Sequence, residues 1–248
     1  MKKIFIFTLF VMLTFVLSAC TININVPNVA RGSGIITSEE RQVSGYDQVT
    51  FNGAGELYIE QGTEEKLVIE AEDNVLPFIT SEVKNGNLTL GIDTEFFKSK
   101  VIPTKPMVYR LTVIDLKGIE INGAADLQVK PLVSNEFVLN INGAGDMVFE
   151  DLQSAKLTVE LDGGANVTVA GLVTEQTVVI NGAGGYNAGD LQTSTTSITY
   201  NGASQSTVWV LDELDIVING AGTVKYYGDP HVSQDISGVG DVKPLGNK

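Results

Sequence analysis

Ile121-Asn122-Gly123-Ala124 is one copy of a short phrase that this 248-residue chain repeats along its second half. Further copies stand at 141–144, 180–183, 200–203 and 218–221, with weaker ones at 51–54, 161–164 and 236–239. From 122 onward the Asn, or its substitute, recurs every 18 to 20 residues. A near-constant period of this kind is typical of a solenoid, and solenoids present long regular surfaces for binding. The repeat therefore favours a scaffold or binding protein over an enzyme.

The residues around each Asn alternate between apolar and polar, which indicates strands. In most copies, apolar residues stand three and one positions before the Asn and five and seven positions after it. This period of two is that of a strand with one buried face. A third apolar column, ten positions after the Asn, contains Leu132, Leu152, Leu172, Leu191 and Leu211. We therefore predict an all-β, single-domain parallel β-helix whose coils of about 18–20 residues have three short sides.

The chemistry of the repeated phrase indicates a sharp turn between the two strands. The Gly is expected to supply a positive φ and to leave no side chain against the neighbouring coil. The Ala that follows is small enough to point inward. Stacked Asn side chains can pass amide hydrogen bonds from coil to coil as a ladder. The expected members of this ladder are Asn52, Asn122, Asn142, Asp162, Asn181, Asn201 and Asn219.

The stretch between Gly62 and Gly118 does not keep the repeat, although it contains credible strands. The 70 residues from Asn52 to Asn122 equal about three and a half periods, and we interpret them as irregular coils. The segment 93–106, with its paired Phe, lysines and prolines, is expected to be a loop over one flank or end. At the open end of the stack, such a loop would prevent edge pairing with other molecules.

The N-terminus has the features of a lipoprotein leader. Two lysines precede an apolar run that is too short to span a membrane comfortably, and small residues precede Cys20, the sole cysteine of the chain. This pattern predicts a signal peptide at 1–19, a lipidated Cys20 that begins a tether at 20–41, and the β-helix at 42–248. Attached acyl chains would hold the protein on a membrane.

The chain is acidic, with a formal net charge of −14 that becomes −16 once the leader and its two lysines are removed. This charge excludes nucleic acid as a natural partner. Thr21 follows the cysteine where an Asp would retain some lipoproteins in the inner membrane. We therefore expect lipid anchoring in the outer membrane if the organism has one, and otherwise on the outer face of the cytoplasmic membrane.

The repeated Ile-Asn-Gly or Phe-Asn-Gly phrase, the segment 43–49 (Val-Ser-Gly-Tyr-Asp-Gln-Val) and the leader together resemble a known bacterial family, the putative auto-transporter adhesins with a head GIN domain. The resemblance covers about 42–232. It implies a right-handed parallel β-helix at the cell surface and brings no catalytic residues. The Gly of the Gly-Ile-Asn signature is seldom present here; 118–122 is the nearest match.

Candidate chemistry lies mainly four residues after the Asn, where Asp126 and Asp146 should be neighbours in the stack. Such a pair could hold Ca²⁺, or could be two solvated carboxylates. His231 stands alone and is expected in a turn. Trp209 and Tyr227 could line a strip that binds glycans if both face outward.

These patterns predict a lipid-anchored envelope protein that serves as a non-catalytic adhesion or scaffold module. Its expected partners are the membrane, through the N-terminal lipid, and a glycan or surface protein. It needs no cofactor unless Ca²⁺ binds. The alternatives are a polysaccharide lyase or hydrolase with the same fold, which would need an outward cluster of acids and a base on neighbouring coils, and a calcium-stabilised structural module.

Overall fold

The computed structural model describes residues 30–99 and 101–248, so the predicted leader, Cys20 and its lipidation lie outside the described residues. Within these residues the chain is built almost wholly from strands, with one short helix, α2 (Thr94–Ser99), and a single 3-10 turn, Leu76–Phe78. The strands are β1 (Ala30–Arg31), β2 (Ile36–Arg41), β3 (Gln48–Asn52), β4 (Ala54–Gln61), β5 (Lys66–Glu72), β6 (Ile79–Lys84), β7 (Asn87–Ile92), β8 (Val101–Ile102), β9 (Val108–Val113), β10 (Gly118–Ile121), β11 (Ala124–Val129), β12 (Leu132–Ile141), β13 (Ala144–Leu161), β14 (Gly164–Ile180), β15 (Ala183–Tyr200), β16 (Ala203–Ile218), β17 (Ala221–Tyr227), β18 (His231–Ile236) and β19 (Val239–Gly246).

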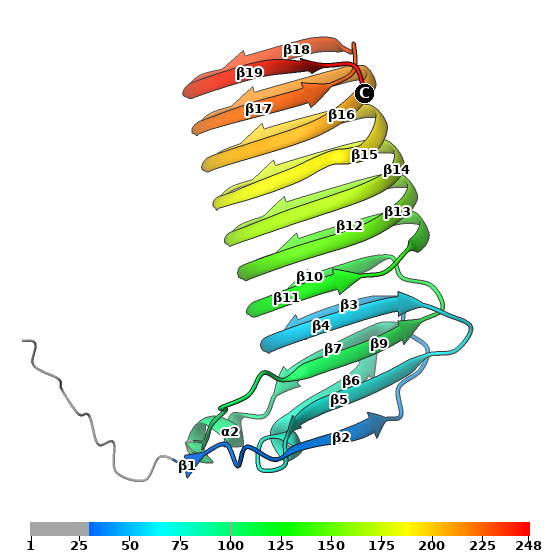
Figure 1. The fold of residues 1–248 in the computed structure, drawn as a ribbon, viewed down its shortest axis with the longest axis vertical. Helices are drawn as coiled ribbons and strands as arrows, with labels where there is room; N and C mark the ends of the chain where they lie inside the picture. Colours follow the sequence, from blue (N-terminus) through cyan, green and yellow to red (C-terminus); the bar gives the residue numbers. More distant parts are fainter. Residues whose placement is uncertain (1–29, 100) are drawn as a thin grey trace, which may run out of the picture.

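The strands wind into a β-solenoid of about six turns with stacked parallel coils, which confirms the predicted fold class. Figure 1 shows two long faces that meet at the repeated turn along one edge. Coils stack in register, with Ile121 opposite Ile141 and then Leu161 and Ile180. The Asn and Gly of each turn therefore form columns parallel to the solenoid axis.

The core is a stack of apolar columns inside the coils, as the alternation predicts. The positions three and one before the Asn are buried from β10 to β16. On the strand after the turn, Leu127, Met147 and Val167 form a buried column. Burial of this apolar area at about 25 cal/mol per Å² is the main force that holds the coils together.

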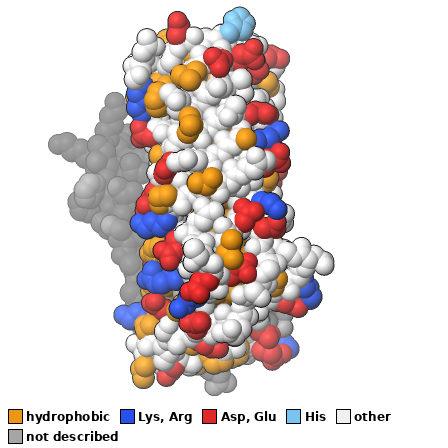
Figure 2. Space-filling model, turned by 90° about the vertical axis from the view of Figure 1, so that its right-hand side faces the viewer, with side chains coloured by type: hydrophobic (Ala, Val, Ile, Leu, Met, Phe, Trp, Pro, Cys, Tyr) orange, Lys and Arg blue, Asp and Glu red, His pale blue; other side chains and the backbone are white. Residues whose placement is uncertain are grey.

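The third side of the coil follows the prediction only in part. Leu132, Leu152 and Leu191 are buried, but Leu172 is 56% exposed and Leu211 44% exposed. Figure 2 shows the molecule from the side opposite the repeated turn, where apolar side chains lie scattered among charged ones. The cause of the leucine exposure is coil length: shorter coils lose residues at this corner, so Gly171, and not Leu172, stacks on Leu152. A shift in strand register at each of these corners absorbs the difference in coil length, so the Asn-Gly turns stay aligned from coil to coil.

The turn glycines are required for a different reason than expected. None of them has a positive φ. Instead, a Cβ at Gly143 would lie 1.8 Å from the carbonyl oxygen of Gly123 in the preceding coil, and one at Gly182 would lie 2.0 Å from that of Gly163. The prediction for the following Ala is also wrong: Ala144 and its equivalents are exposed, because the inward alternation resumes one residue later, at Ala125 or Ala165.

The N-terminal part of the domain differs from the predicted run of irregular coils. β3 and β4 stack directly on β10 and β11, although 70 residues separate Phe51 from its neighbour Ile121. On their other side lie β7 and β9, in parallel. Strands β2, β5 and β6 pair antiparallel and cover this end of the solenoid (Figure 1).

The insertion takes the place of a turn in this region. Between β7 and β9 the chain forms α2 and β8, and β8 pairs with β1. The sequence assigned 20–41 to a tether, but β2 pairs with β5 along its whole length, so the folded domain begins before residue 42. Within the described residues, no helix has the length and apolar character needed to cross a membrane.

Candidate functional site

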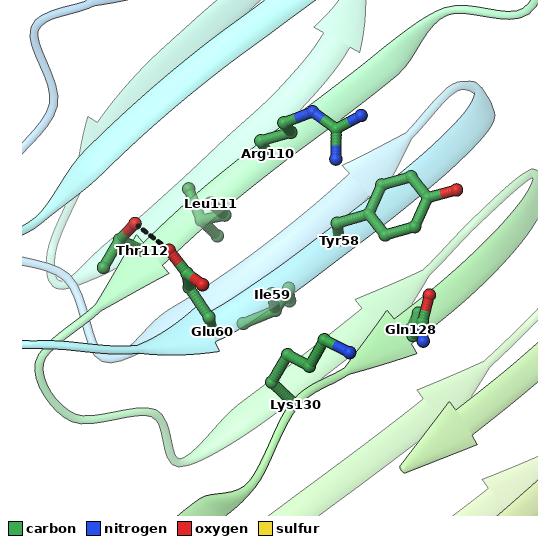
Figure 3. Close-up of a pocket in the computed structure, with 8 residues that line it drawn as sticks. All are labelled: Tyr58, Ile59, Glu60, Arg110, Leu111, Thr112, Gln128 and Lys130. Atoms are coloured by element: carbon green, nitrogen blue, oxygen red, sulfur yellow. Dashed lines mark hydrogen bonds between the residues drawn. The ribbon is translucent and has the colours of Figure 1, made fainter. Parts of the chain in front are cut away.

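A shallow groove lies on the outer face of the sheet formed by β9, β4 and β11 (Figure 3). Its volume is about 150 Å³, and its lining side chains come from all three strands. We call it the Tyr58 groove. The lining residues are Tyr58, Ile59, Glu60, Arg110, Leu111, Thr112, Gln128 and Lys130. Parallel stacking of β9, β4 and β11 places Arg110, Tyr58 and Gln128 side by side, and these three side chains form the main row of the groove.

Tyr58 is the central aromatic side chain of the groove. The guanidinium carbon of Arg110 lies 4.8 Å from the centre of the Tyr58 ring, within the range of a cation–π contact. The Nε of Arg110 also donates to Glu70 at 3.1 Å. The phenol donates to Glu56 at 2.9 Å, and this hydrogen bond raises the pKa of Tyr58. The ring is therefore held in a fixed position.

Lys130 and Gln128 are held at the other side of the groove by one carboxylate. The Nζ of Lys130 and the Nε2 of Gln128 both donate to Oε1 of Glu150, each at 2.7 Å. The hydrogen bond from Lys130 is the main cause, and that from Gln128 the next, of the lowered pKa of Glu150. Both cations of the groove thus already have an acidic partner, which leaves little attraction for an anionic ligand.

The groove is small and carries several polar side chains. Enclosed ligand sites are usually about 300–1,000 Å³, so this volume accommodates one ring or a short edge of a larger molecule. Its amide, carboxylate, hydroxyl and ammonium groups can exchange hydrogen bonds with a hydroxylated ligand.

The predicted metal pair lies beside this groove, one outward row nearer the turn. Asp126 and Asp146 are neighbours: the backbone N–H of Asp146 donates to Oδ1 of Asp126 at 3.2 Å. Asn166 in the next coil donates its amide to Oδ1 of Asp146 at 2.9 Å. Within the described ranges, no group of three or more His, Cys, Asp or Glu side chains is placed to hold a metal ion. The two aspartates are thus adjacent, and both interpretations of the pair, a Ca²⁺ site and two solvated carboxylates, stay predictions.

The other predicted candidates have different surroundings. Trp209 and Tyr227 are stacked neighbours, and the Nζ of Lys248 lies 5.4 Å and 5.2 Å from the centres of their rings. The chain's own C-terminus therefore lies over this predicted glycan strip. His231 is the first residue of β18 and not a turn residue; its neighbour in the stack is Glu213.

The predicted ladder residues form one column along the turn edge. The amide of Asn122 donates to Asn52 at 2.8 Å, and that of Asn142 donates to Asn122 at the same distance. Beyond Asp162 the amides continue, each donating to the residue one coil before it, at Asn181, Asn201 and Asn219. An ionised Asp162 has no amide hydrogen to donate to Asn142, so the chain of donors is interrupted there.

Sequence reasoning missed the Tyr58 groove. Its residues come from β4, β9 and β11, which are adjacent only because β3 and β4 stack between β7/β9 and β10/β11. The available signal was the match between 51–54 and 121–124, which places Tyr58 and Gln128 six residues after equivalent Asn positions. No comparable pattern placed Arg110 beside them.

A parallel β-solenoid presents long, regular exposed faces. The profile of the putative auto-transporter adhesin family, head GIN domain, matches residues 45–230, and the chain belongs to this family. No curated protein matches the sequence. Family membership supports an adhesion-type role and a location at the cell surface or envelope.

Solved structures have the same fold. A putative adhesin from Bacteroides fragilis aligns with a TM-score of 0.80 and 25% identity, over 87% of this chain and 99% of that one. A putative lipid binding protein from Parabacteroides distasonis aligns at 0.70 and 23% identity, over 87% and 98%. A putative adhesin from the same organism aligns at 0.67 and 21%, over 87% and 99%. At these lower identities the likeness concerns the fold alone.

Proposed function

We propose that this protein is a lipid-anchored, non-catalytic adhesion module of the cell envelope whose Tyr58 groove contacts a neutral saccharide. The anchor is Cys20, in the outer membrane if the organism has one and otherwise on the outer face of the cytoplasmic membrane. Family membership supports the adhesion-type role. The leader sequence supports the anchor.

The observation that carries the proposal is the direction in which the solenoid extends. The first described strands, β1 and β2, lie at one end, and β18 and β19 lie at the other (Figure 1). Eight interstrand steps separate β7 from β18, which at about 4.8 Å per step is about 40 Å. An anchor ten residues before Ala30 would hold one end near the membrane and extend the faces outward.

The charges of the groove support a neutral hydroxylated ligand. Each cation is paired with a glutamate, and the acidic chain repels anions at long range. A sugar ring presents hydroxyls that can both donate to Glu60 and accept from Gln128 or Lys130. Binding of this kind is shallow and needs no enclosed cavity.

The test is binding of the mature chain, residues 20–248 with Cys20→Ser, to a glycan array and to envelope polysaccharides, with product analysis of every ligand. We expect binding without product. Tyr58→Ala should weaken binding at least about tenfold, or about 1.4 kcal/mol. Tyr58→Phe keeps the ring and tests the contribution of the hydroxyl.

Thr168→Ala is the matched control, because Thr168 lies on the same outward row, two coils beyond Gln128 and outside the groove. It should bind as the wild type does. Release of cleaved saccharide would contradict the non-catalytic role and favour a polysaccharide-processing enzyme. Equal binding by Tyr58→Ala and Thr168→Ala would exclude the groove as the contact site.

A further inference from the structure

The C-terminal end of the solenoid is an open pair of strand edges. β18 pairs with β16 and β19 pairs with β17, and Figure 1 shows no described strand beyond them. Apolar side chains remain uncovered there: Val239 is 79% exposed, Leu245 43% and Ile236 36%. The free N–H and C=O groups of such edges can pair with another strand. The opposite end, in contrast, is covered by antiparallel strands.

The outward side chains of β19 form a self-complementary row. Val242 stacks on buried Val224 and points inward, so Val239, Asp241 and Lys243 lie on the outer side. If two β19 strands pair antiparallel about Val242, Asp241 of each copy faces Lys243 of the other. Opposite charges at directly facing positions stabilise an antiparallel pair. The same register places Val239 opposite Leu245, which lies in the bulge that ends the β19 ladder.

The outward row of β18 has the same property. His231, Ser233 and Asp235 stack on the outward positions Glu213, Asp215 and Val217. Antiparallel pairing about Ser233 places His231 of each copy opposite Asp235 of the other. An imidazole N–H can donate to a carboxylate at this position.

Ser233 and Val242, the residues about which β18 and β19 would pair with their copies, lie at the same distance from the turn that joins these strands. Counted outward from the Ser237–Gly238 peptide bond, Ser233 is the fifth residue on one side and Val242 the fifth on the other. One two-fold axis perpendicular to both faces can therefore pass through both strands. The end face is complementary to a second copy of itself on β18 and β19 at once.

We propose that the C-terminal coil binds the C-terminal coil of a second copy of this chain about this two-fold axis. Isologous contacts of this type close at two subunits and do not grow into filaments. Pro244, which faces Gly240 of the other copy in this register, has no N–H to donate, so the pairing of β19 is weaker at that position. Within one chain, Asp241 and Lys243 form an ion pair at 2.5 Å, with both side chains about half exposed. In the dimer, two ion pairs between the copies replace the one within each chain.

This arrangement places the two N-terminal ends at opposite ends of the dimer. If each copy is anchored through Cys20, the two anchors lie in opposing membranes, and the contact joins two surfaces through identical molecules. This consequence depends on the lipid anchor proposed above, whereas the pairing itself does not. The saccharide groove faces sideways on β4, β9 and β11 and is separate from the end face.

The test of pairing uses two charge variants of the mature chain carrying Cys20→Ser. Asp241→Lys gives an end face with two lysines, and Lys243→Asp gives one with two aspartates. In sedimentation at about 0.15 M salt, where exposed charges are screened beyond about 8 Å, the wild type should form dimers. Each variant alone should dimerise at least about tenfold more weakly, and an equimolar mixture should recover the dimer, because lysines then face aspartates.

Lys84→Asp is the matched control, since it makes the same charge change on β6 near the covered end. Circular dichroism melting of every variant checks that the fold is retained. A wild type that stays monomeric at about 100 μM would overturn the proposal. So would a dimer that both single variants leave unchanged, or a mixture that fails to recover it.

The membrane arrangement is tested with lipidated protein in phosphatidylcholine vesicles. Wild-type vesicles should cluster. Vesicles with Asp241→Lys should cluster only when mixed with vesicles that carry Lys243→Asp. A mixture that forms heterodimers in solution but never clusters vesicles would overturn the contact between opposing membranes. Saccharide binding is measured separately with Tyr58→Ala, so failure of one proposal is distinguishable from failure of the other.

Discussion

The turn glycines give a sharp test of how the coils stack. A Cβ at Gly143 would lie 1.8 Å from the carbonyl oxygen of Gly123, where an ordinary contact begins at 3.4 Å. The same oxygen accepts a hydrogen bond from the N–H of Ala144 at 3.0 Å. Gly143→Ala must therefore separate two coils at the turn edge and strain this hydrogen bond.

The cost can be estimated from these contacts. Overpacking in a close-packed interior costs about 1–3 kcal/mol, and loss of a hydrogen bond adds about 1 kcal/mol. For a domain of this size, 1 kcal/mol changes Tm by about 2–4 °C. We expect Gly143→Ala to lower the free energy of unfolding by about 2–4 kcal/mol and Tm by about 5–15 °C.

Gly164→Ala is the matched control for this measurement. A Cβ at Gly164 would meet its nearest atom at 3.5 Å, and Ala is the residue that most other copies of the phrase have at this position. Thermal melting followed by circular dichroism should give an unchanged or slightly raised Tm for this variant. Equal melting of Gly143→Ala and Gly164→Ala would refute the close approach between coils.

Four further predictions concern stability and anchoring. Asp162→Asn should complete the ladder of amides and raise the free energy of unfolding by about 0.5 kcal/mol in denaturant titrations, whereas Glu160→Gln, which removes a nearby charge only, should not. Glu72 accepts hydrogen bonds from the Thr104 hydroxyl and from the N–H groups of Thr104 and Gly34, and that from the hydroxyl is the main cause of its lowered pKa. A lowered pKa stabilises the fold above the unfolded-state value of about 4.3, and this contribution is lost as the pH falls through the folded-state pKa. Glu72→Gln should therefore lower Tm at pH 7, and the difference from the wild type should shrink in acid. A pH-independent difference in Tm would contradict this. About 1 mM Ca²⁺ should leave the Tm unchanged, since Asp126 and Asp146 already accept hydrogen bonds, and a rise that Asp126→Asn abolishes would instead establish a calcium site. Cys20→Ser should move the protein out of the detergent phase in phase partition or leave its leader uncleaved, and a mature protein that still partitions with detergent would exclude the lipid anchor.

The solenoid could be predicted because its residues repeat a local rule. Each Asn-Gly turn is flanked by apolar residues at fixed positions, and this pattern determines which side chains are buried from β10 to β16. The rule fails at the third side, where coils differ in length. Leu172 and Leu211 have the right spacing from their turns but the wrong register at the corner, because a missing residue shifts the neighbours that each Leu meets.

The candidate groove and the end face could not be read from the same rule. The groove depends on the stacking of β3 and β4 against β10 and β11, which follow 70 residues later. Closure of so long a loop has no periodic pattern in the sequence that would predict it. The reason for the turn glycines was also hidden, since a close approach between coils and a positive φ both select Gly. Self-complementarity of the last coil needs the register of β18 and β19, which the weak final copy of the phrase at 236–239 only suggests.

The most direct test of the adhesion function is adherence of whole cells that carry the full chain. Cells with the wild type, Tyr58→Ala, Thr168→Ala or Cys20→Ser are compared on surfaces coated with the polysaccharide that the array identifies, at matched protein amounts in the membrane fraction for the first three. We expect adherence with the wild type and Thr168→Ala. We expect loss of adherence with Tyr58→Ala, which stays anchored, and with Cys20→Ser, which loses its anchor. Equal adherence by all four, or release of cleaved saccharide from the surface, would contradict a lipid-anchored, non-catalytic adhesion module.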